Sequence, residues 1–143
     1  MSEPVVPQRP ALSVEEENYA SSLWPIHLGV KQNAVKMTFA GMAYKLGDIP
    51  RATFRERIRP LPRIFAISLA QAEQLHVPTS MRQTHSAYLK AVGLYRNAAR
   101  KMLDANEENR AGEMLGAHEL STTAASLILE VGEALWPGEY KPN

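Results

Sequence analysis

The chain of 143 residues contains no cysteine. Disulfides, thiolate nucleophiles, cysteine-ligated zinc, iron–sulfur clusters and covalently attached haem are therefore excluded. Long hydrophobic runs are missing too, since the longest apolar stretches, such as residues 64–67, fall far short of the ~20 residues that span a bilayer. The chain also has no large excess of positive or negative charge, because 16 Lys and Arg against 15 Asp and Glu leave a net charge of +1. This balance argues against a globally basic nucleic-acid binder and against an acidic disordered chain.

The two ends of the chain differ from the rest. Residues 1–12 hold Pro4, Pro7 and Pro10 and no apolar segment typical of a signal peptide, which predicts an extended, solvated lead-in. We expect a cytoplasmic protein from the sequence as given, and an exported or lipid-anchored one if a leader has been removed. The predicted organisation is a lead-in over 1–12, one helical domain over 13–138 and a tail over 139–143.

Hairpin turns between alternating apolar runs are missing, whereas apolar spacing near 3.5 residues recurs along the chain. The first predicted helix begins after Ser13, whose spacing to Glu16 is that of a capping box, and stops at Gly47. Pro25 lies inside this helix and is expected to bend it. A second apolar set widens its buried seam, which indicates burial on more than one side. That set is Leu28, Val35, Phe39, Met42 and Leu46.

The second predicted helix has Asp48 as its cap and a proline in its first turn. The Arg-Pro-Leu-Pro run at 59–62 interrupts it. Each proline disfavours the helical conformation of the residue before it, so we expect Arg59 and Leu61 to be extended. A further helical segment covers about 63–76.

Two longer helices follow. The spacing of Ser80 and Gln83 is that of a capping box and predicts the start of a helix that carries a heptad-like seam to residue 106. Asn109 is the candidate cap of the last helix, over 110–136. At ~1.5 Å per residue both helices span roughly 40 Å, and the two pieces of the second helix together reach a similar length. The sequence therefore predicts an all-α antiparallel four-helix bundle, with a Pro-kinked first helix and a second helix broken at Pro60–Pro62.

Histidines supply the first candidate site. Aligning the predicted helices brings His27, His85 and Glu130 to one level, with Tyr88 and Tyr95 nearby. A small ligand, noncovalent haem or a divalent metal could then lie between the first and third helices. The simpler interpretation is a pair of partly buried histidines bonded to polar neighbours. No cofactor is predicted, and ligand binding here remains the alternative function.

An arginine cluster supplies the second candidate site. Five arginines against one glutamate give residues 51–63 a local charge of +4 beside the proline break. Arginines near a helix start suit a phosphate, a carboxylate or an acidic partner, but the cluster also fits a solvated face. Aromatic side chains that stack on bases are not interleaved, so sequence-specific nucleic-acid binding is not expected. The candidate contacts are Arg51, Arg55, Arg59 and Arg63.

Trp24 and Trp136 are each followed by proline and should meet at one end of the bundle. Two indoles there could frame a pocket or a partner contact, or simply belong to the core. Glycine-rich phosphate loops, the Gly-x-Ser-x-Gly elbow and His-Glu-x-x-His are all missing, so an enzyme is not favoured. The sequence predicts a non-enzymatic helical interaction module that self-associates or docks to a protein partner.

Overall fold

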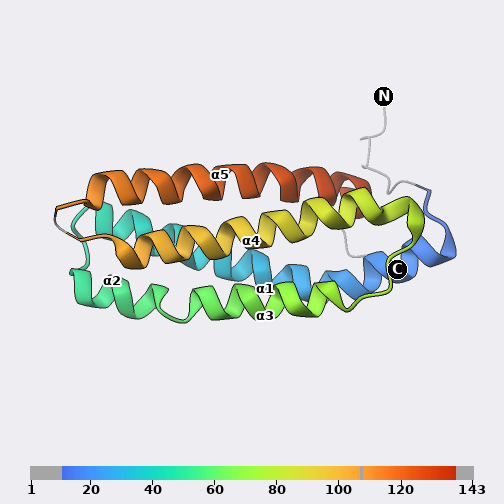
Figure 1. Ribbon diagram of the computed structural model, residues 1–143, viewed down its shortest axis with the longest axis horizontal. Helices are drawn as coiled ribbons and strands as arrows, with labels where there is room; N and C mark the ends of the chain where they lie inside the picture. Colours follow the sequence, from blue (N-terminus) through green and yellow to red (C-terminus); the bar gives the residue numbers. More distant parts are fainter. Residues whose placement is uncertain (1–10, 107, 138–143) are drawn as a thin grey trace, which may run out of the picture.

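A computed structural model describes residues 11–106 and 108–137 of the chain, and within them it contains five α-helices, one short 3-10 helix and no strand. Helices α2 and α3 follow one another along the same side of the bundle and together form one arm. The four arms, α1, α2–α3, α4 and α5, alternate in direction (Figure 1). The predicted all-α antiparallel four-helix bundle is confirmed. Most of the predicted lead-in and the whole predicted tail lie outside the described residues. The elements are α1 (Val14–Lys45), α2 (Arg51–Ile58), α3 (Leu61–Glu73), η1 (Thr79–Met81), α4 (Arg82–Asp104) and α5 (Arg110–Leu135).

The start of α1 is fixed by the predicted capping box. The Ser13 hydroxyl accepts the Glu16 backbone N–H at 3.2 Å, and Oε1 of Glu16 accepts the Ser13 backbone N–H at 2.9 Å. These two bonds satisfy donors that a helix start otherwise leaves without partners. α1 then continues without interruption through Pro25.

The end of α1 is a glycine-dependent turn. Gly47 has a φ of 79°. Its N–H donates to the Tyr44 carbonyl, and the N–H of Asp48 donates to the Ala43 carbonyl. This pair of bonds is a Schellman motif, which needs a left-handed residue at the position of Gly47. The prediction that Asp48 caps the second helix is wrong, because its backbone closes α1 and α2 begins only at Arg51, after Pro50.

The proline break is more helical than predicted. Arg59 has φ −48° and ψ −43°, and Leu61 is already the first residue of α3, so neither is extended. Pro60 and Pro62 both lie where α3 starts, and N–H groups there have no partner within the helix, so their missing donors cost nothing. α3 therefore begins two residues earlier than predicted and ends at Glu73, short of His76.

The predicted caps of the last two helices work differently in the structure. The Ser80 hydroxyl donates to Oε2 of Glu16 at 2.8 Å and does not cap α4, which follows the 3-10 turn η1. Asn109 does stand at the N-cap position of α5, but its side-chain oxygen accepts the Asn106 N–H at 2.7 Å. The Ser80 prediction is thus wrong, and the side chain of Asn109 closes the turn between α4 and α5.

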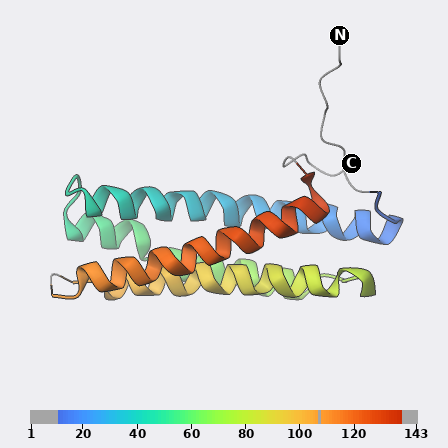
Figure 2. The ribbon, with the colours of Figure 1, turned by 90° about the horizontal axis from the view of Figure 1, so that it is seen from above.

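Helix α5 packs closely along α4 and has little contact with α1. Seen from above, α5 runs diagonally from a position over α4 towards the N-terminal half of α1 (Figure 2). The tryptophans Trp24 and Trp136 meet where the two helices converge. At the other end only long side chains bridge the gap, with Arg110 lying 5.5 Å above the centre of the Tyr44 ring.

This inclination leaves one side of α1 open. The second apolar set of α1, predicted to be buried, is exposed: fractional exposure is 39% for Leu28, 46% for Val35, 65% for Phe39, 52% for Met42 and 72% for Leu46. The opposite side of α1 packs in the core through residues such as Leu23, Val30 and Met37. We call these five exposed residues the α1 stripe. The prediction that α1 is buried on more than one side is wrong for the single chain.

The Gly47 turn gives a stability prediction. Gly47→Ala should lower the free energy of unfolding by about 1–2 kcal/mol, because a Cβ is strained in the left-handed conformation. Gly93→Ala is the matched control. A Cβ at this α4 position meets nothing within 4 Å, so the change should raise stability by about 0.5–1 kcal/mol. Urea titrations measure both, and equal shifts in the two variants would refute the role of the turn.

Candidate functional site

Three hollows follow one another between α1 and α5. The first encloses about 490 Å³ where the two helices converge, and it shares His27, Tyr95 and Ile128 with a second hollow of about 290 Å³. Thr38 lines both the second hollow and a third hollow of about 240 Å³, so these two are also adjacent. Together they form one trench along the bundle, which we call the α1–α5 groove.

The first hollow has aromatic walls. The ring centres of Trp24 and Trp136 lie 5.2 Å apart in an edge-to-face contact, and His27 stacks on Trp136 at 4.8 Å with an interplanar angle of 18°. Tyr95 also lines this hollow, which we call the aromatic pocket. The two tryptophans therefore meet at one end of the bundle, as the sequence predicts, with Trp136 buried and Trp24 half-buried.

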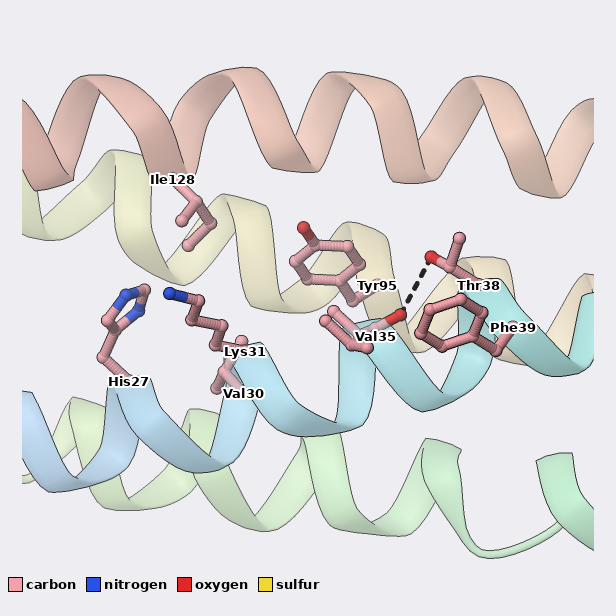
Figure 3. Close-up of a pocket in the computed structure, with 9 residues that line it drawn as sticks. His27, Val30, Lys31, Val35, Thr38, Phe39, Tyr95 and Ile128 are labelled. Carbon is pink, nitrogen blue, oxygen red and sulfur yellow. Dashed lines mark hydrogen bonds between the residues drawn. The ribbon is translucent and has the colours of Figure 1, made fainter. Parts of the chain in front are cut away.

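Polar groups reach the groove where the first two hollows join. Figure 3 shows His27 and Lys31 rising from α1 and the hydroxyl of Tyr95 pointing from α4 towards α5, with Ile128 descending from α5. Burial raises the pKa of Tyr95, so its hydroxyl stays protonated at neutral pH and can donate a hydrogen bond. The Thr38 hydroxyl instead donates to the Ala34 carbonyl at 2.9 Å. The groove is thus mainly apolar, with one group of polar side chains near His27 and another, formed by Lys45, His118 and Ser121, in the third hollow.

His85 lies apart from this site and has a structural partner. Its Nδ1 atom is 2.8 Å from the Tyr19 hydroxyl, and the two rings meet edge to face. Burial lowers the pKa of His85 below its ordinary value, although the Glu73 carboxylate acts in the opposite direction. A neutral ring that carries its proton on Nε2 accepts the bond from the phenol. This arrangement fits the interpretation of a satisfied, buried histidine.

The metal cluster of His27, His85 and Glu130, which the sequence allowed as an alternative, is not assembled among the described residues. Glu130 lines a shallow hollow with Gln83 and Thr84, away from the groove. Within residues 11–106 and 108–137, no group of three His, Asp or Glu side chains is placed to hold a metal ion.

Two buried polar atoms on residues that contact His27 have no hydrogen-bond partner in the described part of the chain. They are the Tyr88 hydroxyl and Nε1 of Trp136. Tyr88 is fully buried and packs edge to face on His27. Because a buried donor without a partner destabilises the fold, a ligand or water that reached these groups would find donors ready to bind.

The arginine cluster is divided by its surroundings. Arg55 is half-buried and donates a hydrogen bond to the Leu103 carbonyl in the last turn of α4. It thereby satisfies a carbonyl that the helix end leaves free. Arg51, Arg59 and Arg63 are exposed. The four arginines thus do not act as one set, because the side chain of Arg55 belongs to the fold.

No protein family model, no curated protein and no solved structure matches this chain. Among the described residues, none of the helices combines the length and the apolar character needed to cross a bilayer. The α1 stripe and the groove are therefore the features of this chain that bear on its function. The sequence identified the residues of the stripe as a second apolar set but predicted that they are buried, and it did not predict the groove, which depends on how α5 is inclined.

The environment of His85 gives a pH prediction. The folded state resists protonation of this ring, whereas the unfolded chain takes up the proton below its ordinary pKa of about 6.5. The stability that neutral His85 contributes is complete above about pH 6.5. It is lost as the pH falls from 6.5 towards the lower pKa of the folded state. Urea titrations at pH 7.5, 6.5 and 5.5 should show a steeper loss for the wild type than for His85→Gln. Parallel pH profiles would show that the ring titrates as in the unfolded chain.

Proposed function

We propose that the protein is a helical interaction module that binds another protein through the α1 stripe. The observation that carries this proposal is the exposure of five large apolar side chains on one unbroken helix. Soluble monomers usually scatter such residues singly, whereas contiguous apolar patches mark interaction sites.

The spacing of the α1 stripe favours a helical partner. Its residues are seven, four, three and four positions apart, which is the alternation of a coiled-coil seam. Leu28, Val35 and Met42 occupy one seam position of successive heptads, and Phe39 and Leu46 occupy the other. Gln32 takes the remaining place, and a polar residue within such a seam helps to fix the register of a partner.

In the α1–α5 groove, α5 forms a second wall beside the α1 stripe. Val35, Phe39 and Met42 belong both to the stripe and to the lining of the groove. A helix laid on the stripe would therefore also approach α5. This is the helix-in-groove mode, in which a few apolar side chains anchor an amphipathic partner.

A charge placed in the stripe tests this function. Phe39→Glu should weaken binding to a protein partner, including self-association, at least about tenfold, because the carboxylate would have to be buried in the contact. Light scattering at increasing concentration and affinity capture with the tagged chain measure the two kinds of binding.

Ile67→Glu is the matched control, since Ile67 is 48% exposed but lies on α3, away from the stripe. Circular dichroism should show that both variants keep the helical fold. Wild-type chains that remain monomeric at high concentration and capture no protein in a Phe39-dependent way would refute the proposed function.

The aromatic pocket supports a second candidate function, the binding of a small apolar ligand. Its volume of about 490 Å³ falls in the usual range for ligand sites, and His27, Tyr95 and Glu133 add polar groups to a mainly apolar lining. Nε1 of Trp136, a buried donor without a partner on a residue that lines this pocket, is a further reason to consider a ligand.

Filling the aromatic pocket distinguishes the two functions. A Cβ at Gly132 meets nothing within 4 Å, so Gly132→Leu should place its side chain in the pocket without disturbing the helix. If the pocket binds apolar ligands, this variant should reduce the binding of anilinonaphthalene sulfonate at least about tenfold, and Phe39→Glu should not. Equal fluorescence from wild type and Gly132→Leu would exclude the pocket as the binding site.

A further inference from the structure

The proposed function leaves the partner open, and the inference here rests on that function. We propose that the partner is a second copy of this chain. The two copies would be related by a twofold axis parallel to the bundle, so that α1 of each copy lies on α5 of the other. Three observations support this arrangement: the apolar area, the charges of the two helices and the levels at which matching residues lie.

The apolar area suits a dimer. Besides the α1 stripe, α5 exposes two leucines, Leu115 at 57% and Leu129 at 66%. Apolar side chains of this size carry on the order of 150–200 Å² each, so seven of them at about half exposure present on the order of 600 Å². A standard interface buries roughly 800 Å² on each partner. The apolar residues would therefore supply most of one such interface, and polar residues at its edge would supply the rest.

Along the α1–α5 groove the two helices carry opposite charges, because the three glutamates of α1 lie in its first turn, before Asn18, and Arg110 is the first residue of α5. From Asn18 to Gly47, α1 and its final turn contain three lysines and no acidic residue. From Ala111 to Trp136, α5 contains four glutamates and neither lysine nor arginine. A surface made of one basic and one acidic helix is complementary to a copy of itself, as a twofold interface requires.

The charges also select between two twofold arrangements of this face. If α1 lay on α1 of the other copy, lysines would meet lysines and glutamates would meet glutamates. If α1 lies on α5 of the other copy, lysines meet glutamates. Because juxtaposed like charges oppose binding, the second arrangement is favoured.

Contacts within one chain show which residues would meet. The Trp24–Trp136 and Tyr44–Arg110 contacts fix the relative levels of α1 and α5. An axis parallel to the bundle keeps those levels in the second copy. Leu28 then lies opposite Leu129, Met42 opposite Leu115, and Lys36 near Glu119 at the edge of the contact. The exposed leucines of α5 thus stand at the levels where the α1 stripe needs apolar partners.

Introduced cysteines test this arrangement, because the natural chain has none. Under mild oxidation, a mixture of Leu28→Cys and Leu129→Cys chains should form a mixed disulfide dimer, and so should Met42→Cys with Leu115→Cys. Each single variant alone should stay uncrosslinked. The control mixture of Leu28→Cys with Leu115→Cys, which lie at opposite ends of the face, should also stay uncrosslinked. Crosslinking of Leu28→Cys with Leu46→Cys would instead show α1 lying on α1 and would overturn the proposal.

Sedimentation of the full chain provides the second measurement. The wild type should be dimeric, and Phe39→Glu should raise the dissociation constant at least tenfold while Ile67→Glu leaves it unchanged. Lys36→Glu should weaken the dimer by up to about fivefold, and adding Glu119→Lys should restore it.

A wild type that stays monomeric would overturn the second copy as partner. Phe39-dependent capture of a different protein would then leave the proposed function standing, whereas the lack of any such capture would refute both. A dimer that is insensitive to Phe39→Glu would place the contact elsewhere and would overturn this inference.

Discussion

Close packing between α4 and α5 is the constraint on which the rest of the structure depends. Both helices turn small side chains to the core, among them Ala91 and Ala98 in α4 and Ala117 and Ala124 in α5, all fully buried. Small residues let two helix axes approach closely. Since α5 is held against α4, it cannot also cover α1 along its whole length. The open groove follows from this packing.

The same packing explains why one of the two apolar sides of α1 is left uncovered. A helix with apolar residues on one side only would need a single neighbouring layer. α1 has two apolar sides, and the bundle covers only one. The uncovered side is continuous, regularly spaced and flanked by lysines, and these features are the basis of the proposed interaction with a protein. The aromatic pocket lies where α5 returns to α1, at the end of this surface.

Much of the fold could be predicted because local signals decided it. The Ser13 capping box, the Gly47 stop and the four arms follow from residues close together in sequence. The failures have two kinds of cause, one long-range and one local. The Ser80 hydroxyl bonds to Glu16, 64 residues away, and the prolines at 60 and 62 are tolerated because they fall where a helix begins.

The candidate site was predicted only in part, for a related reason. The meeting of Trp24 and Trp136 followed from counting along antiparallel helices, whereas the alternative cluster of His27, His85 and Glu130 is not formed among the described residues. Which side of a helix a residue faces depends on rotation about the helix axis, and level alone does not fix that rotation. The inclination of α5, which creates the groove, is set by packing that the pattern of a single helix does not encode.

The short turn between α4 and α5 bears on the order of folding. Contacts between these two helices join residues near one another along the chain, so little loop-closure entropy is lost in forming them. Contacts between α1 and α4, such as the bond from Tyr19 to His85, join residues 66 positions apart and form at a higher entropic cost. We therefore expect the C-terminal hairpin to assemble before α1 docks. The first arm, which carries the proposed interaction surface, would then dock onto a hairpin that is already formed.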